Sequence, residues 1–231
     1  MPAGSNILNV VRLGRMSYAR VLELQLRAVE RVKNSREAGA TEEFLFLVEH
    51  EPPVITVGRG GDADHVLASA DRLAALGVEL HQSSRGGDVT YHGPGQIVAY
   101  PVIDLAARGR DIHAYLRNLE EAVIRTLAGY GLAAARAEKF TGVWIGREKI
   151  CAIGVAVTRW VTYHGLALNV STALDHFNLI VPCGLRERGV TSLTKLLGRP
   201  VATDEVATAL AEELAKVLKF ARTAEASVES V

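Results

Sequence analysis

The sequence predicts an α+β fold, in which helices pack on a mixed, largely antiparallel sheet. Three β-rich runs follow one another between residues 142 and 170, as antiparallel neighbours do, and helices and strands do not alternate strictly. No sequence period recurs. The 231 residues are 48% hydrophobic, enough to bury a core without disulfides or metal. We therefore expect one domain over residues 1–231, with loose tails at about 1–5 and 221–231.

Hydrophobic spacing and turn residues predict the elements of the first half of the chain. Apolar residues at helical spacing among Arg, Glu and Lys indicate an amphipathic helix over residues 17–36. Pro52 and Pro53 separate two short apolar runs, which we predict to be strands because proline ends pairing. The full set is an edge strand at 7–11, the helix at 17–36, strands at 44–48 and 54–57, a helix at 69–76 closed by Gly77, and a strand at 78–81.

The second half follows the same logic. Asp111 is a suitable N-cap for a helix with Ile112, Tyr115, Leu116, Leu119, Val123 and Leu127 on one face. Thr203 is expected to cap the last helix, whose first turn holds acidic residues. The remaining predictions are a strand at 96–103, three β-rich runs at 142–146, 149–157 and 162–170, an apolar run at 177–182 that ends as a strand before Cys183, and a short helix within 190–197.

A glycine-rich stretch at residues 85–96, with the sequence RGGDVTYHGPGQ, lies at the centre of this order. Glycine is used where φ must be positive or where another group comes very close, so this stretch predicts a shaped loop. Its polar side chains, Arg85, Asp88, Thr90, Tyr91 and His92, are of the kinds that orient a ligand, and an apolar segment follows directly. A plain hairpin turn is the alternative.

The bulk properties exclude several functional classes. Lys and Arg number 26 against 26 Asp and Glu, so no general attraction to nucleic acid or membrane is expected. The two cysteines, Cys151 and Cys183, have no zinc-ligand or disulfide spacing, the histidines have no metal-ligand spacing, and no nucleotide-binding glycine motif occurs. We expect no metal and no signal peptide, and therefore a cytoplasmic protein.

Cys183 and Lys149 are the candidates for chemistry. Cys183 lies between Pro182 and Gly184, where a strand-end thiol near free backbone N–H groups would suit a nucleophile for acyl transfer. The alternative is a small buried hydrophobic residue. A half-buried Lys149 beside a cysteine thiol would lower the pKa of that thiol or accept and return the thiol proton. Strand alternation places Lys149 on the Cys151 side, so Lys149–Cys151 and Lys149–Cys183 remain rival pairs unless a turn breaks the alternation.

The strand that contains Cys151 has two unlike faces. Cys151, Ile153, Val155 and Val157 alternate with the small residues Ala152, Gly154 and Ala156. The small face is shallow and leaves room for an extended ligand such as an alkyl chain, although close helix packing is an alternative. The stretch at 163–169, YHGLALN, similarly follows a histidine with glycine and small apolar residues.

Together the stretches 85–96, 149–154, 164–169 and 182–184 closely resemble, in the same order, the lipoyl (octanoyl) transferases. The resemblance covers about residues 44–197 and implies a fold like that of biotin and lipoate protein ligases. It implies an acyltransferase that moves an octanoyl (or lipoyl) group from octanoyl-acyl carrier protein to a lysine of lipoyl-carrier domains, as the first step of lipoate cofactor synthesis. The acceptors would be lipoyl domains of 2-oxoacid dehydrogenase complexes and the glycine-cleavage carrier protein.

The resemblance also implies residue roles. Cys183 would carry the octanoyl thioester and Lys149 would activate it, which decides against the Cys151 pair. The acyl pocket would be lined by Arg85, Gly86, Gly87, Asp88, Val89, Thr90, Tyr91, His92, Ala152, Ile153, Gly154, Gly165, Leu166 and Ala167. Backbone N–H groups near Gly86, Gly87 or Gly184 would meet the oxyanion. No ATP or other cofactor is expected, because thioester exchange followed by amide formation runs downhill.

Two alternative functions remain open at this level. One is an ATP-dependent lipoate or biotin protein ligase of similar fold, which would not need Cys183. The other is a non-catalytic acyl-binding module. A basic run of Arg186, Arg188, Lys195 and Arg199 follows Cys183 and is a candidate docking site for the acidic acyl carrier protein, with a solvated surface as the alternative.

Overall fold

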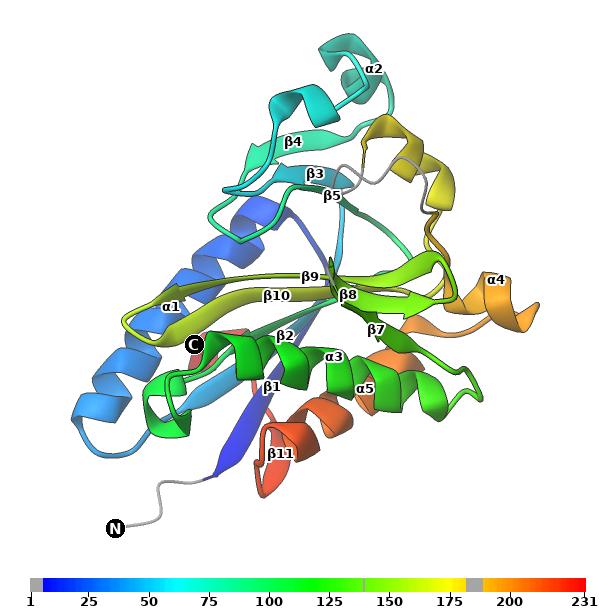
Figure 1. The fold of residues 1–231 in the computed structure, drawn as a ribbon. Helices are drawn as coiled ribbons and strands as arrows, with labels where there is room; N and C mark the ends of the chain where they lie inside the picture. Colours follow the sequence, from blue (N-terminus) through cyan, green and yellow to red (C-terminus); the bar gives the residue numbers. More distant parts are fainter. Residues whose placement is uncertain (1–5, 139, 182–188) are drawn as a thin grey trace.

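A large sheet forms the centre of the molecule (Figure 1). The computed structural model describes residues 6–138, 140–181 and 189–231. The strand order is β11-β1-β2-β6-β10-β9-β8-β7, with parallel pairing of β1 to β11 and to β2 and antiparallel pairing elsewhere. The predicted mixed, largely antiparallel sheet is therefore confirmed. The bounds are β1 Ile7–Met16, β2 Glu43–His50, β6 Gln96–Val102, β7 Ala135–Ala137, β8 Phe140–Ile145, β9 Glu148–Thr158, β10 Val161–Asn169 and β11 Arg222–Glu225.

Helices cover both faces of this sheet, because its central strands alternate between two cores (Figure 1). On β2, Phe44 and Phe46 pack with α1 (Tyr18–Glu37), whereas Leu45 and Leu47 pack on the side of α3 (Ile112–Ala128) and α5 (Thr203–Val217). Both faces are thus buried, as a sheet between helix layers requires. The helices predicted at 17–36 and after Asp111 are confirmed, and Asp111 caps α3 by accepting from the Ala114 N–H at 2.9 Å.

A second, three-stranded sheet stands beside the large one and was not predicted (Figure 1). Its order is β4 (Glu79–Gln82), β3 (Val54–Val57) and β5 (Val89–His92), with β3 parallel to β4 and antiparallel to β5. The predicted strands at 54–57 and 78–81 belong to it. Its core includes residues from α2 (Ala70–Ala75) and from the 3-10 helix Leu174–Leu179. Shorter elements elsewhere are the 3-10 helices Ala63–His65, Leu105–Arg108 and Val228–Ser230 and the helix α4 Leu193–Leu197.

Several local predictions are wrong for identifiable reasons. The strand at 7–11 is longer and is not an edge strand, because the tail expected to be loose supplies β11 beside it. The glycine-rich stretch is not all loop, since β5 lies inside it. Within 177–182, Phe177 belongs to a 3-10 helix and Ile180 makes only an isolated bridge with Val66. The last helix is capped from Ala202, without a side-chain hydrogen bond from Thr203.

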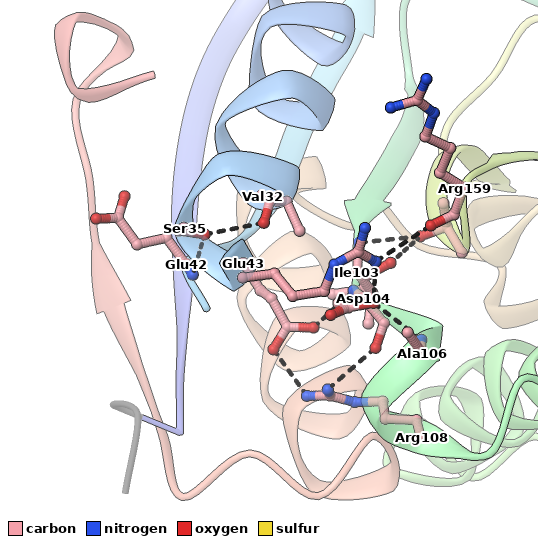
Figure 2. A network of polar contacts seen from close by, with 11 residues as sticks. Val32, Ser35, Glu42, Glu43, Ile103, Asp104, Ala106, Arg108 and Arg159 are labelled. Atoms are coloured by element: carbon pink, nitrogen blue, oxygen red, sulfur yellow. Dashed lines mark hydrogen bonds and ion pairs between the residues drawn. The ribbon is translucent and has the colours of Figure 1, made fainter. Parts of the chain in front are cut away.

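A partly buried charge network joins the large sheet to the C-terminal end of α1 (Figure 2). Arg108 donates to the Glu43 carboxylate at 2.9 Å, and the second Glu43 oxygen accepts from the Asp104 N–H at 2.8 Å. Arg36 on α1 reaches Asp104 Oδ1 and the carbonyl of Arg159 in the β9–β10 turn, each at 3.2 Å. Burial raises the pKa of Glu43 even beside Arg108. The network fixes the end of the sheet remote from the glycine-rich stretch.

None of the helices in the described parts of the chain is both long and apolar enough to cross a membrane.

Candidate active site

A cavity of about 610 Å³ lies between the glycine-rich stretch and the large sheet. This volume is in the range of small-molecule sites, roughly 300–1,000 Å³. All the predicted pocket residues except Tyr91 line it: Arg85, Gly86, Gly87, Asp88, Val89, Thr90, His92, Ala152, Ile153, Gly154, Gly165, Leu166 and Ala167. Three segments that are distant in sequence therefore meet around one space. Lys149 lies on the same wall.

Small residues form the floor of the cavity. Antiparallel pairing of β9 with β10 sets Ala152 opposite Ala167 and Gly154 opposite Gly165. Directly opposed residues of a strand pair share one face of the sheet, so these four form a shallow strip. The strip leaves room for an unbranched apolar chain, as the alternation along residues 152–156 indicated.

The glycine-rich stretch crosses this strip in close contact with β9. The Gly86 N–H donates to the Val155 carbonyl at 2.8 Å, and a Cβ at Gly154 would lie 2.7 Å from the Gly86 carbonyl oxygen. Gly87 has a φ of 87°, in the left-handed region that favours glycine. The Gly86 N–H, already donating, is not available for an oxyanion as expected above.

Arg85 is buried and holds the stretch against the small sheet. Its guanidinium donates to the Thr56 carbonyl at 2.7 Å, to the Thr56 hydroxyl at 2.8 Å and to the Gly86 carbonyl at 3.1 Å. A buried guanidinium is stable only when such acceptors replace water. It also places a positive charge on the cavity wall.

Asp88 and Tyr91 have roles within the small sheet. The Asp88 carboxylate lies 2.6 Å from the His65 ring and accepts from the Asp62 N–H at 3.2 Å, so it fixes the neighbouring loop. The Tyr91 ring packs edge-on against Phe177, and its hydroxyl bonds His176 at 2.7 Å. Burial raises the pKa of Tyr91 to about 12. Tyr91 therefore supports the site from the core of the small sheet.

Of three neighbouring buried histidines, His92 and His164 line the cavity and His50 lies behind His92. The His50 and His92 rings lie 5.7 Å apart, and Tyr100 lies beside both His50 and His164. Burial lowers the pKa of His50 to about 4, that of His164 to about 3, and that of His92 well below its ordinary value. All three rings are therefore neutral at neutral pH. His164 has a φ of 57°, which interrupts the regular course of β10.

Hydrogen bonding fixes the proton of His92. The Tyr91 carbonyl can only accept, so Gln96 Nε2 donates to it at 3.2 Å and to Asn169 Oδ1 at 2.9 Å. Gln96 Oε1 is then the acceptor that faces His92 Nδ1 at 2.8 Å, which places the ring proton on Nδ1. His92 Nε2 is left as a hydrogen-bond acceptor.

A β-bulge sets the direction of Lys149. Val143 pairs with Cys151 and Trp144 pairs with Lys149, so one step on β8 matches two on β9 and Ile150 is the extra residue. Ile150 and Cys151 consequently both lie in the core beneath α3, whereas Lys149 lines the cavity. The turn that would break the alternation is thus a bulge. Burial raises the pKa of the Cys151 thiol strongly, which makes it a poor nucleophile.

Lys149 as a whole residue is 8% exposed. Its side chain lies over the Trp144 indole, with the ammonium 4.8 Å from the ring centroid. Gly142, with a φ of 126°, leaves space for the lysine stem, because a Cβ there would lie 3.5 Å from Lys149 Cε and 2.6 Å from the Cys151 carbonyl. The buried Glu120 carboxylate accepts from the Gly142 N–H at 3.1 Å.

Cys183, Arg186 and Arg188 lie outside the described residues, so the predictions for them remain predictions. Of the rest of the basic run, Lys195 forms an ion pair with Glu148 at 2.8 Å, and Arg199 donates to the Pro200 carbonyl.

Other residues of the cavity were not predicted as site residues: Tyr18, Gly60, Val98, Tyr100, Ile112, Leu116, Phe140, Thr141, Val155 and His164. Ile112 and Leu116 were assigned to the apolar face of α3, but its first turns border the cavity. The 36% exposure of Ile112 reflects this. Their apolar character is the same signal in both settings, so sequence alone does not separate them. Among the described residues, no group of three or more His, Cys, Asp or Glu side chains is placed to hold a metal ion.

Comparison with known proteins decides the family. The model of the lipoyl protein ligase A/B catalytic domain matches residues 17–215. The chain belongs to this family. An octanoyltransferase of Caldicellulosiruptor saccharolyticus is 50% identical over 212 residues, which are 91% of this chain and 88% of that one. The chain is thus an enzyme of the octanoyltransferase group, and octanoyl transfer in lipoate synthesis is its activity.

Similarity to solved structures confirms the predicted fold. A lipoate-protein ligase A bound with ATP superposes with a TM-score of 0.73 at 23% identity, over 97% of this chain and 91% of that one. A biotin protein ligase of Aquifex aeolicus gives a TM-score of 0.51 at 12% identity, over 91% and 69%. At these identities the likeness concerns the fold alone.

Proposed function

We propose that this octanoyltransferase works through a thioester on Cys183, with Lys149 as the residue that activates the thiol. The observation that carries the proposal is the position of Lys149. The bulge in β9 directs it into the cavity lined by the small-residue strip and the glycine-rich stretch, while Cys151 lies in the opposite core. A nearly buried ammonium is poorly screened by water and therefore stabilises a neighbouring thiolate strongly.

The first step of the proposed reaction exchanges one thioester for another. The Cys183 thiolate attacks the octanoyl carbonyl of octanoyl-acyl carrier protein, the new C–S bond forms, and the carrier thiolate leaves. The neutral Lys149 amine takes the proton from the Cys183 thiol, and the resulting ammonium returns it to the departing carrier thiolate. The neutral apolar strip binds the octanoyl chain, and the full set of predicted pocket residues contributes to this site.

The second step forms an amide. The amine of a lysine on a lipoyl-carrier domain attacks the Cys183 thioester, the C–N bond forms as the C–S bond breaks, and the proton lost by the amine passes through Lys149 to the released Cys183 thiolate. The proposed acceptors are the lipoyl domains of 2-oxoacid dehydrogenase complexes and the glycine-cleavage carrier protein. The two steps need no nucleotide, because exchange between thioesters is near equilibrium and the amide formed in the second step is more stable than a thioester. The mechanism needs a reduced thiol and therefore a reducing compartment such as the cytoplasm.

Intact-mass analysis tests this proposal directly. Incubation with octanoyl-acyl carrier protein, without ATP, should add one octanoyl group to the wild-type enzyme and to Cys151→Ser but none to Cys183→Ser. Cys151→Ser is the matched control, because Cys151 is the other cysteine of the chain and is fully buried. Labelling lost only in Cys151→Ser would refute the assignment. Acyl transfer that occurs only with ATP would favour the ligase chemistry of the structural relatives.

A further inference from the structure

Two residues that end the sequence motifs have no role in the reaction as proposed. Gln96 closes the glycine-rich stretch and Asn169 closes the stretch at 163–169, and both are buried, with exposures of 1% and 4%. They contact each other, since Gln96 Nε2 donates to Asn169 Oδ1 at 2.9 Å. Buried amides are costly unless each polar atom is satisfied, so their pairing demands an account.

The pair forms one continuous chain of hydrogen bonds. At one end Gln96 Oε1 accepts from His92, on the cavity wall. At the other end Asn169 Nδ2 donates to the Thr191 carbonyl at 3.0 Å. Every donor and acceptor in the chain has one possible direction, because the Tyr91 and Thr191 carbonyls can only accept. The amides therefore connect the cavity wall to the backbone near Thr191.

That backbone is the strand neighbour of Lys149. The Lys149 N–H donates to the Gly189 carbonyl at 2.9 Å, and the Thr191 N–H donates to the Lys149 carbonyl at 3.0 Å. Val190 thus forms a parallel bridge with Lys149 at the start of β9, just before the bulge at Ile150. The hydrogen bond from the Asn169 side chain holds this neighbour at Thr191.

We propose that Asn169, held by Gln96, is a positioning residue for Lys149: it fixes segment 189–191, which in turn fixes the backbone from which the Lys149 ammonium enters the cavity. The inference rests on the proposed role of Lys149. Asn169 touches neither the acyl group nor the reacting atoms, so its effect passes through Lys149. A shift of about 1 Å in a reacting group costs on the order of a hundredfold in rate.

A double-mutant cycle separates positioning from general stability. The variants are Asn169→Ala, Lys149→Ala and the double variant, and Asn9→Ala is the control. The Asn9 amide also donates to a backbone carbonyl, that of Glu43 at 3.1 Å, but in the β1–β2 pair. The first readout is the single-turnover rate of octanoylation of Cys183. The second is the pH midpoint of Cys183 alkylation by iodoacetamide, located by peptide mass.

Asn169→Ala should slow octanoylation by about tenfold to a hundredfold and raise the alkylation midpoint toward the ordinary thiol value of about 8.5. In the Lys149→Ala background it should change neither quantity further. Asn9→Ala should leave both at wild-type values. Asn169→Asp keeps the side-chain shape and the acceptor for Gln96 but removes the donor to Thr191, so it should behave like Asn169→Ala.

The inference is overturned if Asn169→Ala retains the wild-type rate and midpoint, or if it shifts the alkylation midpoint equally with and without Lys149. An Asn169→Asp variant with the wild-type rate and midpoint would also overturn it, because packing of the side chain, and not its donor to Thr191, would then matter. Failure of the proposed function looks different. In that case the wild-type enzyme itself is not octanoylated on Cys183, or Lys149→Ala leaves the alkylation midpoint unchanged.

Discussion

Replacement of Gly154 by alanine should detach the glycine-rich stretch from the large sheet. A Cβ at this position would lie 2.7 Å from the Gly86 carbonyl oxygen and 3.2 Å from Arg85 Cδ. Carbon–oxygen contacts even of the C–H···O type keep about 3.3–3.6 Å, so the two backbones must separate by at least about 0.6 Å. The 2.8 Å hydrogen bond from Gly86 to Val155 would then lengthen to about 3.4 Å, beyond the usual range of about 2.7–3.2 Å.

The cost of this separation can be bounded. Overpacking in a close contact costs typically about 1–3 kcal/mol, and the weakened hydrogen bond adds about 1 kcal/mol. The loss of unfolded-state freedom on replacing glycine returns about 0.4–1 kcal/mol. We expect a net destabilisation of about 2 kcal/mol, which corresponds to a fall in Tm of about 4–8 °C for a chain of this size.

Gly86→Ala is the matched control, because it adds a methyl group to the other side of the same contact. Its Cβ would lie 3.6 Å from the Val155 carbonyl oxygen, an ordinary contact, and its φ is outside the left-handed region. Thermal unfolding followed by circular dichroism should show a Tm near that of the wild type for Gly86→Ala and the predicted fall for Gly154→Ala. Equal Tm values for the two variants would refute the close-contact reasoning.

Three further predictions follow from burial. The pKa values of His50, about 4, and His164, about 3, are below those of the unfolded chain, which therefore binds more protons below pH 6.5. The free energy of unfolding, measured in urea, should fall from pH 6.5 to about pH 3, and His50→Gln should make this fall less steep. A hexanoyl substrate lacks two methylenes of the octanoyl chain, about 1.6 kcal/mol of burial, so its kcat/KM should be about 15-fold lower than that of the octanoyl substrate. Ala152→Val should reduce this octanoyl-to-hexanoyl ratio of kcat/KM, and an unchanged ratio would show that the acyl chain does not bind on the strip that contains Ala152. Arg108→Met should cost about 3 kcal/mol at pH 7 by leaving Glu43 unpaired, and less near pH 4, as urea midpoints would show.

Much of the fold could be predicted because its signals are local. The apolar periodicity of α1 and α3 and the cap at Asp111 each reflect a single element, and the apolar run of β2 reflects burial on both faces of the sheet. Strand β11 has no such signal. Its sequence, RTAE, has no apolar alternation and its residues are partly or fully exposed, because it is held by backbone pairing with β1. Pairing that uses only main-chain atoms leaves little trace in side chains.

The glycine-rich stretch shows where sequence reasoning about the site stopped short. Treated as a loop, it offers every polar side chain to a ligand. Treated as the strand it contains, Val89 and Tyr91 fall on one face and Thr90 and His92 on the other. The structure follows the second pattern: Tyr91 packs in the core of the small sheet, and His92 lines the cavity. Alternation within four residues therefore carried information that the glycine content concealed.

The direction of Lys149 is the feature that sequence could not supply. Strict alternation puts Lys149 and Cys151 on one face, whereas the structure places Cys151 in the core and Lys149 on the cavity wall. One extra residue at Ile150 puts Lys149 and Cys151 on opposite faces of the sheet. No glycine or proline adjoins Ile150 in β9 to indicate a bulge there. The cause lies across the strand pair, where Gly142 and Trp144 of β8 leave space for the lysine stem and a ring for its ammonium. A Cβ at Gly142 would lie 2.6 Å from the Cys151 carbonyl oxygen, so the close approach of the two strands beside the bulge requires glycine there. The side chain that faces the cavity is thus decided by the neighbouring strand.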